Sequence, residues 1–250
     1  MNALMSSFKI LSYNLGYCAG FTGSVPKYVL YSLRHIRCSP KVKAKVLSDV
    51  RRMLREEEPD LCCFMEIEPQ SLAHLSESLS SVYAQSHIIN KYGEESVFQT
   101  MPTFSKRSNG IMSKMELPFQ THFLKNGMKK LLYEIPVQQD LHVFAGHFAL
   151  QKNTRQEQFT ELKKLVAKRE RVILCGDFNI FKGFGELDEL IRHGDLQIIN
   201  TEDDHTYPSH KPKKPLDLFI CSKNVDVKSF RVLTESKASD HLPVMLEVQL

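Results

Sequence analysis

Apolar and polar positions show two patterns along the chain, a helical periodicity in some segments and short apolar runs typical of strands in others. Apolar residues recur at helical spacing in residues 41–57 and 155–168, and shorter helical patterns cover 69–80 and 186–192. Pro59 ends the first of these helices. Short runs rich in apolar residues predict strands at 8–13, 61–65, 82–90, 110–124, 130–137, 141–148, 171–175, 216–222, 226–234 and 244–249.

The distribution of these elements predicts the fold class. Helices occur in both halves of the chain, and the runs that end at Met65 and Cys175 have the apolar character of strands buried on both faces. We therefore expect an α/β fold, a four-layer sandwich in which two packed mixed β-sheets are flanked by helices. No linker rich in Pro, Gly or Ser divides the chain, so we expect a single catalytic domain over residues 1–250.

Composition excludes several classes of protein but does not select a function. The 250 residues include 33 Lys plus Arg and 29 Asp plus Glu, which gives a net charge of +4, and 42% of residues are hydrophobic. These values exclude a disordered or fibrous chain. The mildly basic charge permits a phosphate-bearing partner such as nucleic acid without requiring one. No run approaches the roughly 18 apolar residues of a membrane span.

The cysteines indicate a reducing environment. None of the six forms a C-x-x-C pair, and Cys62, Cys63 and Cys175 lie in apolar runs where cysteine acts as a small core residue. Neither a disulfide framework nor a zinc site is expected. The first residues lack the pattern of a secretory signal. We therefore expect a cytoplasmic or other reducing intracellular location, while the oligomeric state stays open.

Polar side chains suited to phosphate or metal chemistry recur where the predicted strands begin or end. The set consists of Asn14, Glu66, His147, Asp177, Asn179, Asp217, Asp240 and His241. Strand ends are rigid, and sites are commonly built on the loops beside them. The set offers carboxylates, amides and imidazoles but no Ser or Cys nucleophile beside a base. It therefore suits water as the nucleophile and a hard divalent cation, Mg²⁺ first and Mn²⁺ second.

Each member of this set also has an ordinary structural interpretation. Asp177 and Asn179 are typical of Asx turns, His147 could be a satisfied histidine at a strand end, and Asp240 could belong to a turn. The functional interpretation depends on the order in which the motifs SYNLG, PDLCCFMEI, GHFAL, GDFN, PLDLFICS and SDHLPVMLEV occur. In that order they resemble the endonuclease/exonuclease/phosphatase superfamily from residue 8 to residue 248.

Two departures place the chain within that superfamily. Abasic-site endonucleases usually carry a second acid shortly after the first Asn, whereas Leu15 and Gly16 follow Asn14 here. They also carry a Tyr where this chain has His147. The sequence therefore resembles the His-bearing branch, which includes deoxyribonuclease I-like nucleases, deadenylases, sphingomyelinases and phosphoinositide phosphatases.

The resemblance implies a metal site. Glu66 resembles the principal carboxylate ligand, and Asn14 resembles its neighbour that holds metal-bound water or phosphate. Asp240 would reach the metal directly or through water. Magnesium or manganese is the implied cofactor.

The resemblance also implies catalytic roles. Asp177 would orient or deprotonate the attacking water or protonate the leaving oxygen, and Asn179 would donate to a phosphate oxygen. His241 would act at the scissile phosphate, with Asp217 fixing its tautomer. His147 occupies the position of a second catalytic histidine.

Substrate contacts are less defined by the sequence. Asn153 and Arg155 could touch a phosphate, although a helix N-cap and a solvated arginine explain them equally well. The basic face of residues 41–57 could line a polyanion groove or be simply solvated. The basic loop 210–215 could attract phosphate. The segment 17–40 is long for a connection and is the candidate for substrate selection.

The implied function is a divalent-metal-dependent phosphoesterase that hydrolyses phosphodiester bonds by direct water attack. A nuclease-like activity is the first hypothesis, with a phosphate-ester substrate that could be nucleic acid. A phosphatase or phosphodiesterase of inositol phosphates or phospholipids is the alternative within the same chemistry. An inactive scaffold that binds a partner is the alternative from another class, and it predicts a lost ligand.

Overall fold

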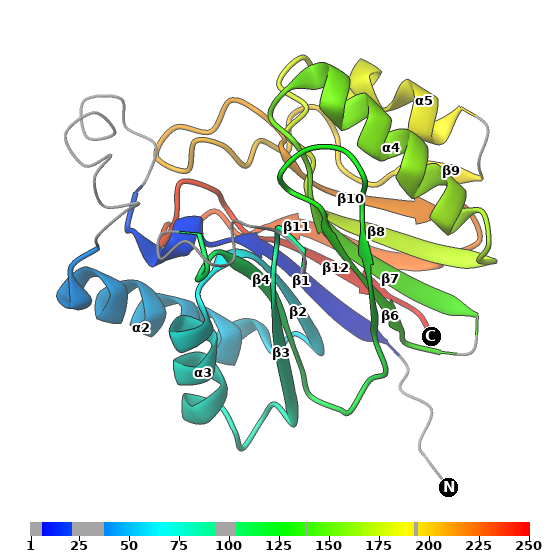
Figure 1. The fold of residues 1–250 in the computed structure, drawn as a ribbon. Coiled ribbons are helices and arrows are strands. Elements are labelled where there is room, and N and C mark those ends of the chain that lie inside the picture. Colours follow the sequence, from blue (N-terminus) through cyan, green and yellow to red (C-terminus); the bar gives the residue numbers. More distant parts are fainter. Residues whose placement is uncertain (1–6, 22–37, 94–103, 139, 193–194) are drawn as a thin grey trace, which may run out of the picture.

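The computed structural model describes residues 7–21, 38–93, 104–138, 140–192 and 195–250. Two six-stranded mixed sheets pack face to face, and helices cover their outer faces, which confirms the predicted four-layer α/β sandwich (Figure 1). None of the helices in these ranges is long and apolar enough to cross a membrane. Each of the six cysteines, all within these ranges, is a free thiol.

The first sheet contains the N-terminal strands and the last two strands of the chain. Its strand order is β11 (Val227–Val232), β12 (Val244–Val248), β1 (Phe8–Asn14), β2 (Leu61–Ile67), β4 (Ser108–Ser113) and β3 (Gln85–Asn90). Helices α2 (Pro40–Glu57) and α3 (Pro69–Ser78) cover its outer face with apolar side chains (Figure 1).

The second sheet is built from the middle of the chain. Its strand order is β5 (Gln120–Phe123), β6 (Leu131–Pro136), β7 (Leu141–His147), β8 (Arg171–Asp177), β10 (Asp217–Ser222) and β9 (Leu196–Ile198). Helix α4 (Lys152–Val166), the 3₁₀ turn η4 (Phe184–Leu187) and the short helix α5 (Asp188–Ile191) lie against its outer face.

One predicted strand, residues 110–124, is wrong as a single element. The structure splits it into β4 and β5, which belong to different sheets. Pro118 lies between them and has no N–H to donate to a ladder. Met115, Leu117 and Phe119 turn into the core between the sheets, so this stretch is as apolar as a strand without being one.

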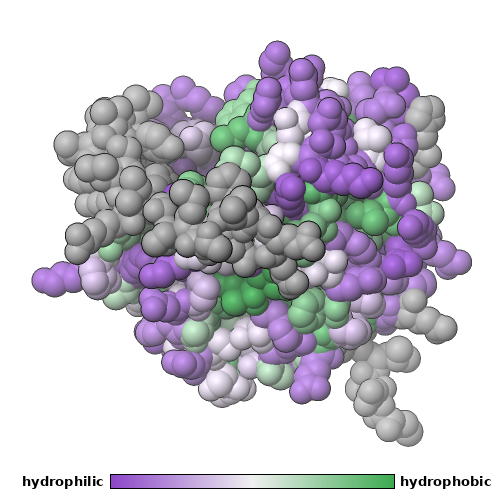
Figure 2. Space-filling view, in the orientation of Figure 1, coloured by the Kyte–Doolittle hydropathy of each residue, from purple (hydrophilic) through white to green (hydrophobic). Residues whose placement is uncertain are grey.

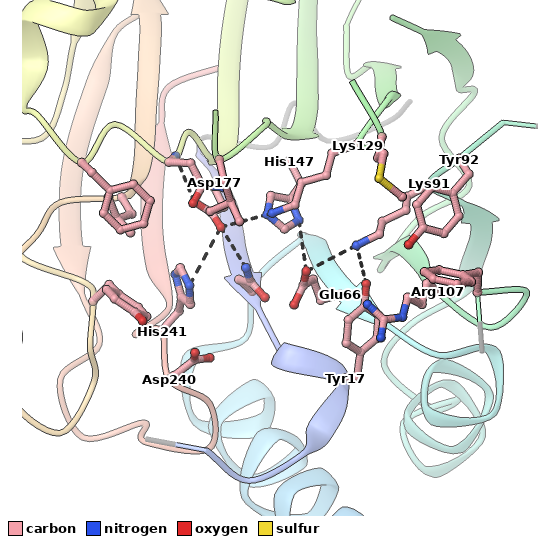
Figure 3. Close-up of a pocket in the computed structure, with 18 residues that line it drawn as sticks. Tyr17, Glu66, Lys91, Tyr92, Arg107, Lys129, His147, Asp177, Asp240 and His241 are labelled. Atoms are coloured by element: carbon pink, nitrogen blue, oxygen red, sulfur yellow. Dashed lines mark hydrogen bonds and ion pairs between the residues drawn. The ribbon is translucent and has the colours of Figure 1, made fainter. Parts of the chain in front are cut away.

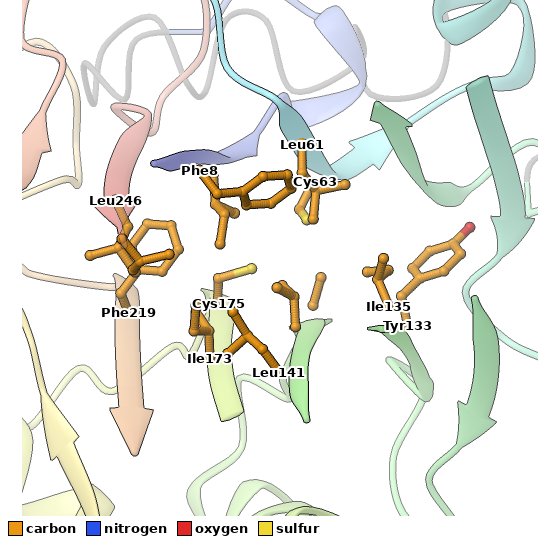
Figure 4. Packing of buried hydrophobic residues seen from close by; sticks show 14 of the residues in the cluster. Phe8, Leu61, Cys63, Tyr133, Ile135, Leu141, Ile173, Cys175, Phe219 and Leu246 are labelled. Carbon is orange, nitrogen blue, oxygen red and sulfur yellow. The ribbon is translucent and has the colours of Figure 1, made fainter. Parts of the chain in front are cut away.

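The core between the sheets explains why so many strands are apolar on their inner face. Phe8, Leu61 and Cys63 of the first sheet meet Ile173 and Phe219 of the second (Figure 4). These residues are almost wholly buried. Polar residues prevail on the face shown in Figure 2, with apolar patches near its middle. Burial of apolar surface between sheets is the main force that fixes their relative position.

The topology carries the polar strand ends to one edge of the sandwich. Strands β1 and β2 are parallel, and so are β7 and β8, whose register pairs His147 with Asp177. Strand β10 runs antiparallel to β8 and begins at Asp217 opposite Asp177. Strand β12 runs antiparallel to β1, so residues 240–241 enter it beside Asn14. Carboxyl ends of parallel strands and the starts of their antiparallel neighbours therefore meet at one edge.

Two glycines let the central strands of the second sheet approach closely at this edge. Gly146 and Gly176 are register partners, one residue before His147 and Asp177. Gly176 has φ +140°, and a Cβ there would lie 1.8 Å from the carbonyl oxygen of Gly146. Only glycine fits this position, which places the two functional side chains next to each other.

Candidate active site

A pocket of about 440 Å³ opens at the edge where these strand ends meet (Figure 3). Every strand-end residue predicted from the sequence lines it except Asp217, which lies directly behind His241. Those lining residues are Asn14, Glu66, His147, Asp177, Asn179, Asp240 and His241. The fold thus brings together side chains that are spread over the whole sequence.

Asp177 is the centre of the hydrogen-bond network in this pocket. Its Oδ2 accepts a hydrogen bond from Asn14 Nδ2 at 2.9 Å and lies 3.0 Å from His147 Nε2 and 3.9 Å from His241 Nε2. Its Oδ1 accepts the backbone N–H of Asn179 at 3.0 Å. Burial alone would raise the pKa of Asp177, but His147 and His241 outweigh it and hold the pKa well below its usual range. Asp177 is therefore an ionised hydrogen-bond acceptor.

His241 and Asp217 form a buried pair next to this centre. His241 Nδ1 lies 2.7 Å from Asp217 Oδ2, and Asp217 is fully buried. Burial lowers the pKa of His241, but Asp217 and Asp177 outweigh it and raise the pKa to about 10. The ring is therefore an imidazolium that donates from Nδ1 to Asp217 and directs Nε2–H toward Asp177.

Thr206 completes this pair and was not found from the sequence. Its Oγ1 donates to Asp217 Oδ2 at 2.6 Å and accepts the backbone N–H groups of Leu216 and Asp217 at 3.1 Å each. The Thr206 hydroxyl thereby holds the Asp217 carboxylate in the orientation that positions the His241 ring. It belongs to an irregular loop that no motif marks, so only the fold reveals it.

Glu66 and His147 form the opposite side of the pocket floor. Glu66 ends the regular part of β2 with φ 52° at a register shift, and its N–H donates to Asn109 Oδ1 at 3.2 Å. Its Oε1 lies 3.8 Å from His147 Nδ1 and 3.4 Å from Lys91 Nζ. Burial would raise the pKa of Glu66, but Lys91, His147 and Lys129 lower it to about 2.

His147 differs from His241 in its charge. Burial is the main cause that lowers the pKa of His147 to about 4, and the nearby Lys129 ammonium adds to it. Its ring is therefore neutral where that of His241 is charged. The two histidines beside Asp177 thus differ in protonation state: His241 is a cation, and His147 is neutral and able to accept a proton.

The oxygen donors of the pocket fit a hard divalent cation. Figure 3 shows Glu66 and Asp240 on the same side of the pocket, below Asp177 and His147. Burial raises the pKa of Asp240, and the charge of Glu66 raises it further. Two carboxylates that destabilise each other in this way are stabilised by a cation bound between them. Asn14 Oδ1 accepts the N–H of Gly16 at 3.1 Å, which fixes its amide beside them.

A second group of possible ligands has a different character. Donor atoms of Asp177, Asp217 and His241 lie within 4.8 Å of one another. His241 Nδ1 lies 2.7 Å from Asp217 Oδ2, so these two donor atoms are paired with each other in this structure. Among the described residues, this is the group of three such donors that lies close enough together to hold a metal, and Glu66 and Asp240 add two carboxylates to the same pocket.

Asn153 and Arg155, predicted as substrate contacts, do not line the pocket. Asn153 is exposed in the first turn of α4, whose N-cap is Gln151 rather than Asn153 or Thr154. Arg155 is 2% exposed and forms an ion pair with Glu186. Its guanidinium also donates to the carbonyl groups that follow Phe148, at 2.9 and 2.8 Å. Arg155 therefore stabilises the loop after His147 from behind, and the structure places neither residue in the pocket lining.

Of the other segments predicted to contact substrate, one reaches the pocket with a described residue and one does not. Tyr17, the first residue of the segment 17–40, lines the pocket, while residues 22–37 of that segment lie outside the described residues. The loop 210–215 does not line it. On the basic face of α2, Lys43 pairs with Glu68 and Arg52 with Asp49, as expected of a solvated face.

The structure adds a group, here called the cationic wall, of which the sequence indicated only Tyr17. It consists of Lys91, Arg107, Tyr17, Tyr92 and Phe104, all of which line the pocket. Figure 3 shows Lys91, Arg107, Tyr17 and Tyr92 beyond Glu66. Lys91 directly follows β3 and Arg107 directly precedes β4, and the N–H of Lys91 donates to the carbonyl of Arg107 at 3.1 Å. The signal that could have found Lys91 is its position after a predicted strand.

Comparison with known proteins decides the family. The sequence profile of the Endonuclease/Exonuclease/phosphatase family matches residues 11–241. The chain belongs to this family. Enzymes of the endonuclease/exonuclease/phosphatase family are hydrolases that act on phosphate esters, and the site described above lies within the matched residues. No curated protein matches the sequence closely enough to count as a relative.

Solved structures of the family share the fold. An endonuclease/exonuclease/phosphatase from Beutenbergia cavernae has a TM-score of 0.74 and 16% identity, over 98% of this chain and 72% of that one. Truncated TDP2 from Caenorhabditis elegans has a TM-score of 0.67 and 16% identity, over 98% of each chain. A mannosyl-6-phosphatase from Bacteroides thetaiotaomicron has 0.66 and 16%, over 97% and 100%. At this identity the similarity shows the fold alone.

Proposed function

We propose that this protein is a magnesium-dependent phosphoesterase that hydrolyses phosphodiester bonds by direct attack of water, in the manner of a nuclease. One observation carries the proposal. An ionised Asp177 lies between a neutral and a charged histidine, and the carboxylate pair Glu66–Asp240 faces the same pocket. The described pocket residues include no Ser or Cys that could serve as a nucleophile, so water is the nucleophile that fits.

The metal site would be formed by oxygen ligands. Glu66 and Asp240 would bind Mg²⁺, and Asn14 would hold a bound water or a phosphate oxygen. A bound cation would neutralise charge on the phosphate and polarise the bond to be broken. Carboxylate and amide oxygens are the ligands that Mg²⁺ prefers, and Mn²⁺ would replace it.

The residues around Asp177 would perform the proton transfers. Asp177, ionised and anchored by Asn14, would orient the attacking water and accept its proton. His241, held as an imidazolium by Asp217, would donate from Nε2 to a phosphate oxygen as charge develops. Asn179 donates one amide N–H to the carbonyl of Phe148 at 2.9 Å and has a second N–H for the phosphate. Neutral His147 would keep Asp177 in place.

The test is hydrolysis of bis-p-nitrophenyl phosphate by the wild-type protein with Mg²⁺ or Mn²⁺ and with EDTA. We expect turnover that requires metal and that Glu66→Ala and His241→Ala abolish. Glu157→Ala, an exposed acid on α4, is the matched control and should keep wild-type turnover. Absence of metal-dependent turnover, or equal turnover in Glu66→Ala, would refute the enzyme and leave a partner-binding scaffold as the function.

The same chemistry serves a phosphatase of inositol phosphates or phospholipids, and one observation keeps it as the second candidate. The cationic wall lies within the pocket, where it could bind a small polyphosphate as well as a nucleic acid strand. The dependence of substrate affinity on ionic strength distinguishes a nuclease from a phosphatase of this kind. Affinity for a nucleic acid falls steeply with salt because many counterions are released, whereas a compact inositol phosphate shows a smaller slope.

A further inference from the structure

The pocket is electrostatically divided. Three carboxylates line it, those of Glu66, Asp177 and Asp240, and they lie around the proposed metal and the histidines. The cations Lys91 and Arg107 lie together on the other side of Glu66, among aromatic rings (Figure 3). The remaining lysine of the described lining, Lys129, contacts His147 Nε2 at the carboxylate end. Lys91 and Arg107 thus form a positive end of the pocket that is separate from the carboxylates.

Lys91 is an unusual lysine because it is buried. Its side chain is 4% exposed. Its Nζ donates to the Tyr17 hydroxyl at 2.5 Å and lies 3.4 Å from Glu66 Oε1. Lysines are rarely fully buried without a close partner. Glu66 is a distant partner, and a metal ion bound to Glu66 would compete with Lys91 for the same carboxylate.

Arg107 is held by aromatic stacking rather than by an acid. Its guanidinium lies over the Tyr17 ring at 5.1 Å and over the Phe104 ring at 5.4 Å. Within the described residues no carboxylate forms an ion pair with it, unlike Arg155, Arg169 and Arg231. Stacking fixes the plane of a guanidinium and leaves its N–H edge able to bind a phosphate in bidentate fashion.

The backbone under the wall is strained, which is typical of a functional position. Tyr17 has φ 56° and Cys18 φ 55°, in the left-handed region that side chains other than glycine rarely adopt. This conformation turns the Tyr17 ring toward Lys91 and Arg107. Such strain persists where surrounding contacts impose it, and it clusters at ligand sites.

We propose that the cationic wall is a binding subsite for a second phosphate group of the substrate, next to the phosphate that is hydrolysed. The proposal rests on the phosphoesterase function above. A divalent cation that neutralises Glu66 would leave Lys91 without its anion, and Arg107 has no carboxylate partner among the described residues; a phosphate would serve both. A pocket of about 440 Å³ has room for more than one phosphate group. The substrate class is therefore an ester with two phosphates, either a nucleotide strand or an inositol polyphosphate.

The experiment compares matched substrates that differ in one phosphate. The first pair is thymidylyl-thymidine with and without a terminal phosphate at the 5′ or 3′ end. The second pair is inositol 1-phosphate and inositol 1,4-bisphosphate. The ratio of kcat/KM within each pair is measured for the wild type, Arg107→Gln and Lys106→Ala. Lys106 is the neighbouring exposed cation outside the pocket, so Lys106→Ala loses the same charge.

We expect the wild type to favour the doubly phosphorylated member by about tenfold, and we expect Arg107→Gln to bring that ratio close to one. Lys106→Ala should keep the wild-type ratio. The pair that shows the preference identifies the source of the second phosphate. A wild-type ratio near one in both pairs, or an unchanged ratio in Arg107→Gln, would overturn the subsite.

A binding measurement separates this outcome from failure of the proposed function. Isothermal titration in Mg²⁺, in an Asp177→Asn background that slows hydrolysis, with the terminally phosphorylated dinucleotide and with inositol 1,4-bisphosphate reports binding at the wall apart from catalysis. Binding of either ligand that weakens about tenfold in Arg107→Gln and not in Lys106→Ala supports the subsite even if nothing is hydrolysed. Equal binding by all three proteins refutes it even if the enzyme is active. Matching melting temperatures of the variants would show that the fold is intact.

Discussion

The two ends of the pocket are built in different ways. Around Asp177 most side chains come from strand ends. Hydrogen bonds between 2.6 and 3.1 Å join Asn14 to Asp177 and join Thr206 and His241 to Asp217, and the two groups meet where His241 Nε2 lies 3.9 Å from Asp177 Oδ2. In the cationic wall the side chains come from the ends of an edge hairpin and from a strained turn, and aromatic stacking holds them. The end around Asp177 is suited to catalysis in a rigid geometry, and the cationic wall is suited to substrate selection.

The largest effect should come from the network itself. Asp177→Asn keeps the shape of the side chain but removes the charge to which both histidines are directed. We expect kcat/KM for bis-p-nitrophenyl phosphate to fall about a thousandfold, the size typical of a lost general base. The measurement is steady-state kinetics at saturating Mg²⁺.

Asp188→Asn, an exposed acid on α5, is the control for the loss of one carboxylate. Circular dichroism should show the same fold for both variants. A fall of less than tenfold in kcat/KM for Asp177→Asn would mean that Asp177 does not take part in proton transfer. The assignment of catalysis to this end of the pocket would then be wrong.

An effect of similar size, on stability rather than on rate, is expected from Arg155 behind the network. Its guanidinium and the Glu186 carboxylate are 2% and 3% exposed, so Arg155→Leu leaves a buried charge without its partner. Loss of one member of such a pair costs about 3–5 kcal/mol in the free energy of unfolding. Urea denaturation measures it, and Arg192→Leu, an exposed arginine with pairs at 3.8 Å, should cost less than about 1 kcal/mol.

The double variant Arg155→Leu with Glu186→Leu removes the unpaired charge and should recover part of the loss. If Arg155 instead contacted substrate, its replacement would raise KM and leave stability near that of the wild type. That result would restore the substrate-binding role that the sequence suggested and the structure does not support.

The network could be predicted from the sequence because its residues follow a rule. Asn14, Glu66, His147 and Asp177 each end a run that has the apolar character of a buried strand, and parallel strands bring their ends to one edge. The order of the motifs then specified the family. The fold class followed from the same runs and is confirmed. The single strand predicted over residues 110–124 was wrong, because apolar core residues in the connection between β4 and β5 have the pattern of a strand.

The cationic wall could not be predicted in the same way. Lys91 follows a strand that ends at the same edge, but a lysine after a strand is normally solvated. Its burial depends on Tyr17, 74 positions earlier, and on Glu66. Arg155 shows the same difficulty, because its partner Glu186 lies 31 positions later. Side-chain pairs that form by tertiary packing leave no local pattern in the sequence. Which charges are buried together therefore becomes visible only in the folded chain.

The smallest effect tests the wall while leaving its rings in place. Tyr17→Phe removes the hydroxyl that accepts a hydrogen bond from Lys91 Nζ and keeps the ring under Lys91 and Arg107. A lost hydrogen bond to a charged group costs about 1.5 kcal/mol. We expect KM for the doubly phosphorylated substrate to rise about tenfold, with a smaller change in kcat. Tyr83→Phe, which removes a buried hydroxyl in the outer core far from the pocket, should leave KM at the wild-type value. An equal rise in KM for substrates with one and with two phosphates would place Tyr17 at the reacting phosphate, and the two ends of the pocket would then be one site.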